Sequence, residues 1–136
     1  MIVVLDTNVI LQARAPNHRY HVILQQLLEG RFALALSHEI LLEYEEILTE
    51  RAGQFRWMQF IRTLDSISAF RQSILHIEPS FHFRLIPADP DDDKFADCAI
   101  AANADYLVTE DAHFDAMKTA GYKPRVISPA EFIALL

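Results

Sequence analysis

The sequence predicts an α/β fold with a mainly parallel sheet, and two observations carry this prediction. Short apolar runs that suit strands alternate along the 136 residues with longer segments of helical apolar spacing. This alternation is typical of parallel strands joined by helical crossovers. The run Ile2–Leu5 is wholly apolar and mostly β-branched, without alternating polar residues. Such a run indicates a central strand that is buried on both faces of the sheet.

The predicted strands are short apolar runs bounded by glycine, proline or polar residues. They span residues 2–5, 32–36, 74–77, 106–109 and 125–127. The segment 81–86 is either a further strand or an irregular connection, because Pro79, Pro87 and Pro90 punctuate this part of the chain.

The predicted helices occupy the segments between the strands. They span residues 21–29, 38–51, 55–73 (as one helix or two), 92–103, 112–119 and 129–136. Thr7 and Asn8 are good helix-cap residues after the first strand, and Ser37 caps the helix that follows the second. Gly30 and Gly53 are suited to end the helices that precede them.

Length and composition predict one folded domain over residues 1–136. A chain of this length can build one core but not two, and 51% apolar with 23% charged residues indicates a globular protein. The net charge of −7 argues against a surface that binds nucleic acid everywhere. Arg51–His76 departs from this balance, because four arginines stand against one acid there.

Cysteine usage and hydropathy indicate the compartment. The single cysteine, Cys98, excludes an intramolecular disulfide and suits a reducing cytosol. No apolar run approaches the roughly 20 residues of a membrane span. We therefore expect a soluble, cytoplasmic protein.

Asp6 is the first candidate for chemistry. It directly follows the buried strand 2–5, and open α/β sheets bind their ligands at the carboxyl ends of the strands. A half-buried carboxylate is unfavourable unless it is paired, hydrogen-bonded or bound to a metal.

The helix over 38–51 offers a second acid, but its geometry leaves two choices. Its apolar stripe consists of Ile40, Leu41, Tyr44, Ile47 and Leu48. At about 100° per residue, Glu43 and Glu45 flank this stripe on opposite sides. Periodicity alone does not decide between them.

Further acids are predicted to meet Asp6 at the same edge of the sheet. Asp111 closely follows the strand 106–109, and the run Asp91–Asp93 begins a buried helix on which Asp93 and Asp97 share one face. Carboxylates brought together repel one another. A hard cation such as Mg²⁺ or Mn²⁺ relieves that repulsion, and can assist hydrolysis of a phosphodiester.

Each of these features also has a simpler interpretation. An acid after a strand is commonly a turn or cap residue, and an acidic run at a helix start is commonly solvated. His18, His38 and His113 lack metal-ligand spacing, so we interpret them as surface or cap residues. Cys98 is a core residue, and the arginines within Arg51–His76 are more typical of a solvated helix face than of an RNA track. The acids taken together are stronger evidence for a metal site than any one of them alone.

Four sequence blocks, in order, resemble a known family. They are V-L-D-T-N at residues 4–8, S-x5-E-Y-x3-L at 37–48, D-P-D-D-D-K-F-x-D-x-A at 89–99 and A-D-Y-L-V-T-E-D at 104–111. Together they resemble the PIN-domain ribonucleases, in particular the prokaryotic VapC-like PIN proteins that are toxins of toxin–antitoxin pairs. The blocks span most of the chain, and they are specific only in combination.

The resemblance implies a three-layer α/β/α sandwich with a mainly parallel sheet of about five strands. It also implies four acids that hold Mg²⁺ or Mn²⁺ and hydrolyse single-stranded RNA. Carried over by position, these acids are Asp6, Glu43, Asp93 and Asp111, which selects Glu43 over Glu45. The family pattern leaves open whether Asp92, Asp93 or Asp97 is the principal third acid, and it makes Asn8 and Thr109 supporting residues.

The resemblance further implies a small antitoxin as partner and a homodimer. Because the protein is acidic overall, contact with RNA is expected in one cleft with basic edges. The arginines that we expect at these edges are Arg14, Arg19, Arg51 and Arg56.

Two other classes of function compete with a nuclease. Phosphotransfer on Asp6 would suit an acid after a strand, but Asn8 stands where one such family has a second Asp, and no lysine directly follows Thr109 or Ile127. A non-catalytic binding module is the second alternative.

Overall fold

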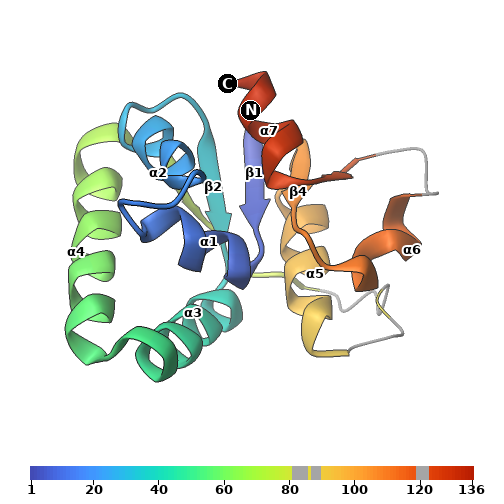
Figure 1. Cartoon of the computed structure of the whole chain (residues 1–136). Coiled ribbons are helices and arrows are strands. Elements are labelled where there is room, and N and C mark those ends of the chain that lie inside the picture. Colours follow the sequence, from blue (N-terminus) through green and yellow to red (C-terminus); the bar gives the residue numbers. More distant parts are fainter. Residues whose placement is uncertain (81–85, 87–89, 119–122) are drawn as a thin grey trace.

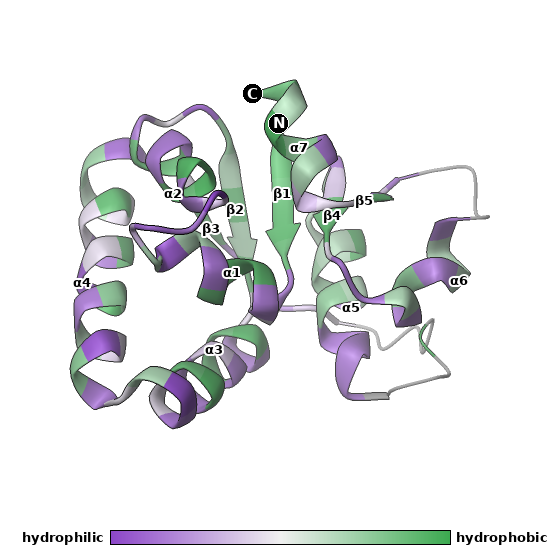
Figure 2. Cartoon of the chain, in the orientation of Figure 1, coloured by the Kyte–Doolittle hydropathy of each residue, from purple (hydrophilic) through white to green (hydrophobic). Residues whose placement is uncertain are grey.

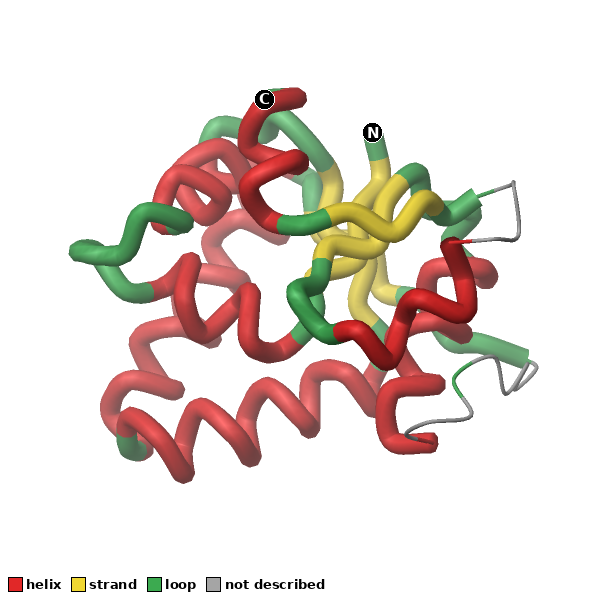
Figure 3. Tube along the Cα trace, turned by 45° about the vertical axis from the view of Figure 1, so that its right-hand side comes forward, coloured by secondary structure: helices red, strands yellow, loops and turns green. Residues whose placement is uncertain are grey.

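The computed structural model describes residues 1–80, 86, 90–118 and 123–136. It confirms the predicted α/β fold, because five parallel strands form one sheet and helices flank it (Figures 1 and 3). The strands are β1 (Ile2–Leu5), β2 (Ala33–Leu36), β3 (Ile74–His76), β4 (Tyr106–Val108) and β5 (Arg125–Ile127). The alternative strand over 81–86 lies, except for Ile86, outside the described residues.

The strand order places β1 at the centre of the sheet. The order is β3-β2-β1-β4-β5, so the chain moves outward from β1 to β3 and then returns to β4 on the other side of β1. β1 and β4 are therefore neighbours at the point where the direction of winding reverses. The crevice beyond the carboxyl ends of two such strands is the usual ligand site of an open α/β sheet.

The helices divide into two groups around β1. One side holds α1 (Thr7–Arg14), α2 (His21–Leu28), α3 (His38–Ala52) and α4 (Gln54–Arg71), and the other holds α5 (Asp93–Ala101) and α6 (Asp115–Lys118) (Figure 1). Two short 3-10 helices, η1 (Pro90–Asp92) and η2 (Ala112–Phe114), lead into α5 and α6. The chain ends with α7 (Pro129–Leu135).

The core follows the apolar pattern of the sequence. Val3, Val4 and Leu5 of β1 are buried on both faces, as the uninterrupted apolar run predicts. The strands β1 and β2 are wholly apolar, whereas the outer helices mix polar and apolar residues (Figure 2). Phe132 of α7 packs edge-on against Phe32, with 5.1 Å between their ring centroids. No helix in the described part of the chain has the length and hydropathy needed to span a membrane.

The predicted helices occur with small changes at their ends. Ser37 caps α3 as predicted, accepting a hydrogen bond from the backbone N–H of Ile40. The cap of α1 was predicted wrongly: it is Asp6, while Thr7 is already helical. The segment 55–73 forms one helix, α4, and the segment 112–118 divides into η2 and α6.

Candidate functional site

Asp6 lies at the carboxyl end of β1, where it caps α1. Its Oδ1 accepts the backbone N–H of Thr7 at 2.8 Å, and its Oδ2 accepts the hydroxyl of Thr109 at 2.7 Å. Only 6% of the residue is exposed. Burial raises the pKa of the Asp6 carboxyl, and the nearby charges of Asp111 and Glu43 add to this rise, while the two hydrogen bonds oppose it.

Glu43 reaches the same place from α3. Its Oε2 accepts the hydroxyl of Thr7, and its Oε1 pairs with Nζ of Lys94 at 3.0 Å. The next residue, Tyr44, is fully buried and donates its hydroxyl to the backbone carbonyl of Leu5. The hydrogen bond of Tyr44 therefore fastens α3 to the end of β1, and this fixes Glu43 beside Asp6.

The two glutamates that flank the apolar stripe of α3 have different surroundings. Glu43 is half-buried between α1 and α5, with 19% of its side chain exposed. Glu45 is exposed. The difference agrees with the contacts of Glu43, which meets Thr7 of α1 and Lys94 of α5.

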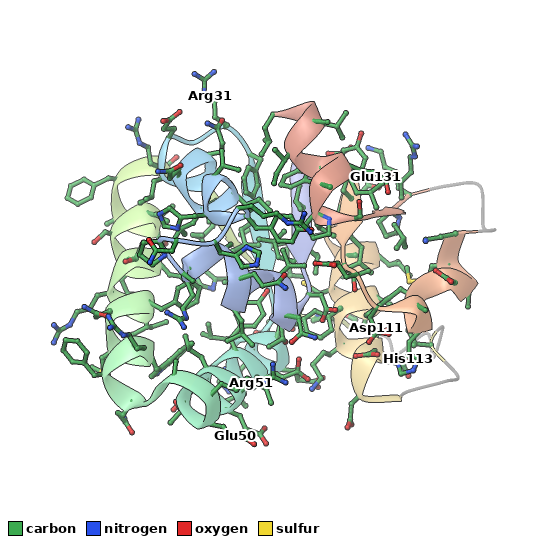
Figure 4. The ribbon with its side chains drawn as sticks, in the orientation of Figure 1. Arg31, Glu50, Arg51, Asp111, His113 and Glu131 are labelled. Atoms are coloured by element: carbon green, nitrogen blue, oxygen red, sulfur yellow. The ribbon has the colours of Figure 1, made fainter. Side chains whose placement is uncertain are left out.

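A group of three possible metal ligands lies beside this acid pair. Asp92, Asp111 and His113 each offer one ligand atom, and these atoms lie within 4.8 Å of one another. Nδ1 of His113 is 3.4 Å from an oxygen of each carboxylate. Figure 4 shows Asp111 and His113 close together at the start of η2. η1 and η2 therefore bring residues that are 21 positions apart to one point.

Asp93 and Asp97, the other two acids of the predicted set, lie outside the group formed by Asp92, Asp111 and His113. Asp93 accepts the backbone N–H of Ile86 with Oδ1 at 2.9 Å. Asp97 is 2% exposed within α5. Among the described residues, neither contributes to the group of ligand atoms formed by Asp92, Asp111 and His113.

The site fits a divalent cation by its charge and its donor atoms. A buried carboxylate whose pKa is raised, as that of Asp6 is, gains stability when a cation lies next to it. The oxygens of Asp92 and Asp111 are close enough to share one ion, and His113 adds a nitrogen donor. Oxygen ligands suit both Mg²⁺ and Mn²⁺, whereas an imidazole ligand favours a transition metal.

Sequence reasoning missed three side chains at this site. The hydroxyl of Thr7 and the ammonium of Lys94 both contact Glu43, and His113 contacts Asp111. Two of these residues could have been found from their position next to predicted acids. Lys94 follows the acidic run Asp91–Asp93, and His113 lies two residues after Asp111. Our interpretation of His113 as a surface or cap residue overlooked its position beside two carboxylates, although its side chain is 46% exposed.

In the described part of the chain, the remaining predicted residues make no hydrogen bond or ion pair with these acids. Asn8 is exposed in the first turn of α1. Arg14 and Arg56 line one cavity between α1 and α4. Arg19 donates to the hydroxyl of the tyrosine that follows it, and Arg51 is exposed at the end of α3 (Figure 4).

Comparison with known proteins identifies one matching family model and several similar folds. The PIN domain family model matches residues 2–113, a region that includes Asp6, Glu43 and Asp111. No curated protein sequence gives a match.

Three solved structures share the arrangement of elements at identities that show likeness of fold alone. FitAcB from Neisseria gonorrhoeae has 22% identity and a TM-score of 0.60, with 94% of this chain and 98% of that chain covered. VapBC2 from Rickettsia felis, bound to a DNA fragment from its promoter, has 19% identity and a TM-score of 0.59 at the same coverage. VapC20 from Mycobacterium tuberculosis, a toxin that cleaves the sarcin-ricin loop, has 15% identity and a TM-score of 0.52, with 90% of this chain and 97% of that chain covered.

Proposed function

Because this chain belongs to the PIN-domain family, we propose that it is a metal-dependent endoribonuclease that hydrolyses phosphodiester bonds of single-stranded RNA. One observation carries the proposal. Asp6, Glu43 and Asp111 come from three distant segments and meet at the carboxyl ends of β1 and β4, with Asp111 beside Asp92 and His113. A cation bound among these acids would offset their mutual repulsion, and a cation held by acids suits phosphodiester hydrolysis.

We propose that Asp6, Glu43, Asp92, Asp111 and His113 hold Mg²⁺ or Mn²⁺. Bound there, the ion would activate water and offset the negative charge that develops on the phosphate oxygens. Asp93 and Asp97 stay candidates for the third acid of the family pattern.

The side chains of the protein have their own roles in this reaction. A carboxylate at the site takes a proton from the attacking water as the general base. Asp6 holds the cation through its ionised carboxylate. Thr109 and the backbone N–H of Thr7 orient this carboxylate. Lys94 and the hydroxyl of Thr7 orient Glu43. Attack of the water on phosphorus breaks the bond to the leaving sugar oxygen, which then takes up a proton.

We further propose that the protein is the toxin of a toxin–antitoxin pair, active in the cytoplasm. The support is the fold it shares with VapBC2, FitAcB and VapC20, and the buried free thiol of Cys98, which suits a reducing compartment. A small antitoxin and a second copy of the chain are the expected partners. The RNA is expected to meet Arg14, Arg19, Arg51 and Arg56.

The test is cleavage of end-labelled single-stranded RNA by purified protein with Mg²⁺ or Mn²⁺, and with EDTA. We expect cleavage that EDTA abolishes, and a loss of about 100-fold or more in Asp6→Asn and Glu43→Gln. Glu45→Gln is the matched control, because it removes an exposed glutamate from the same helix, and it should cleave as wild type does. Equal cleavage by all four proteins would reject the proposal. RNA binding without any cleavage would favour the non-catalytic module.

A further inference from the structure

A cavity of about 220 Å³ lies between the end of α1 and α4, away from the acids. Arg14 contributes from the last turn of α1. Arg56, Gln59 and Thr63 contribute from one face of α4, since residues three and four apart on a helix are neighbours. In Figure 1, α1 leads from the end of β1 towards α4, so this one helix joins the acids to the cavity.

The two arginines of this cavity have no acidic partner among the described residues. Nε of Arg14 is buried and has no hydrogen-bond partner in that part of the chain. Nη1 of Arg56 donates a hydrogen bond to Oε1 of Gln59 at 3.0 Å. This bond occupies the side-chain oxygen of Gln59. The cavity therefore presents N–H donors and positive charge in a protein whose net charge is −7.

The lining strengthens the attraction of this cavity for an anion. Leu24 and Phe60 form an apolar part of the wall and are 9% and 4% exposed. Charge interactions are stronger beside such a wall than in open water. The volume is below the roughly 300–1,000 Å³ of pockets that enclose drug-sized ligands. A compact anionic group fits better than a whole small molecule.

We propose that this two-arginine cavity binds a phosphate of the RNA strand other than the phosphate that is cleaved. Two planar guanidinium groups can donate parallel hydrogen bonds to the several oxygens of a phosphate. From Thr7 to Arg14, α1 rises by roughly 10 Å, so a strand cleaved at the acids passes along α1 to reach the cavity. This inference rests on the proposed nuclease function and adds a second contact for its substrate.

The test measures binding of a fluorescein-labelled ten-nucleotide oligouridylate by anisotropy, in EDTA so that no cleavage occurs. We expect Arg14→Met and Arg56→Met each to weaken binding by about fivefold to tenfold. The slope of log K against log salt should become less negative by about 0.7 for the lost phosphate contact. Arg62→Met is the matched control, because it removes an exposed arginine of α4 that does not line the cavity, and its affinity should stay within twofold of wild type.

Cleavage kinetics and short substrates separate this inference from the nuclease proposal. Arg14→Met and Arg56→Met should raise KM and keep kcat on the oligouridylate, and should leave cleavage of the dinucleotide UpU unchanged, because UpU is too short to reach the cavity. Arg14→Lys and Arg56→Lys keep the charge and should give intermediate affinities. Thermal unfolding identifies any variant that fails to fold.

The outcomes are distinct. Wild-type cleavage combined with equal affinity in all variants would overturn the cavity proposal and leave the nuclease intact. A loss in Arg62→Met as large as that in Arg14→Met would also overturn it, because charge alone would then explain the effect. A glutamate-rich peptide that binds this cavity while RNA does not would overturn it in favour of a protein partner. If Arg14→Met and Arg56→Met lose RNA affinity while Arg62→Met does not, and wild type cleaves no RNA, the phosphate contact stands and the nuclease proposal is rejected.

Discussion

The hydroxyl of Thr109 donates a hydrogen bond to Oδ2 of Asp6 across 2.7 Å, and this bond joins the end of β4 to the end of β1. The same hydroxyl oxygen accepts the backbone N–H of Asp111 at 2.9 Å. One side chain therefore orients two of the acids. Its hydrogen bond also opposes the rise in the pKa of Asp6 that burial causes.

Replacing Thr109 by Val should impair cleavage most strongly at low pH. Without the hydrogen bond the pKa of Asp6 rises further, so a higher pH is needed before the carboxylate is ionised. We expect the acidic limb of the pH–rate profile to move to higher pH, and the rate on that limb to fall severalfold. Thr109→Ser keeps the hydroxyl and should keep the limb in place. A profile of Thr109→Val that overlays wild type would contradict this role.

Asp6→Asn should stabilise the metal-free protein at neutral pH. The pKa of Asp6 is raised above its ordinary value of 3.8, so the ionised carboxylate is less favourable in the folded chain than in the unfolded one. The penalty is absent below the unfolded pKa, grows as pH rises towards the folded pKa and is complete above it. We expect Tm at pH 7 to rise by about 2–5 °C and the gain to vanish near pH 4. Asp65→Asn, an exposed change on α4, serves as control; a lower Tm for Asp6→Asn would show that its hydrogen bonds matter more than its desolvation.

The strongly patterned parts of the chain were predictable from sequence. Ile2–Leu5 could only be a strand buried on both faces, and an acid directly after it had to lie at the ligand edge of the sheet. Thr109 lies at the same edge because β4 pairs with β1 in parallel. For Glu43, local periodicity was insufficient and the family resemblance was needed. Glu43 is half-buried because it meets Thr7 of α1 and Lys94 of α5, which are far from it in the sequence.

The site residues that were not predicted from sequence are positioned by tertiary contacts. Lys94 meets Glu43 across 51 positions of the chain, and His113 meets Asp92 across 21. No local pattern encodes such pairs. The assignment of the third acid was limited in the same way: Asp92 and Asp93 are neighbours, and whether each turns towards Asp111 depends on where η1 ends and α5 begins.

Metal binding should distinguish Asp92 from Asp93. Asp92 lies with Asp111 and His113, whereas Asp93 accepts the backbone N–H of Ile86. Titration calorimetry with Mn²⁺ should show a loss of about tenfold or more in Asp92→Asn and less than threefold in Asp93→Asn. His113→Ala should lose more affinity for Mn²⁺ than for Mg²⁺, because imidazole is a poor ligand for Mg²⁺. The reverse order of the two Asn variants would make Asp93 the third acid, which is the residue that the position-by-position resemblance implies.

Lys94→Met should bind Mn²⁺ more tightly than wild type and yet be less stable without it. The ammonium of Lys94 pairs with Glu43 at 3.0 Å, and both side chains are about one-fifth exposed. Removing it leaves a carboxylate unpaired, which should lower the free energy of unfolding by about 1 kcal/mol in EDTA. It also removes a cation that competes with the metal for Glu43, so Mn²⁺ affinity should rise severalfold. Lys118→Met, which breaks an exposed pair with Asp115, should change neither quantity. If Lys94→Met instead weakened Mn²⁺ binding as Glu43→Gln does, Lys94 would be needed to hold Glu43 in place for the metal.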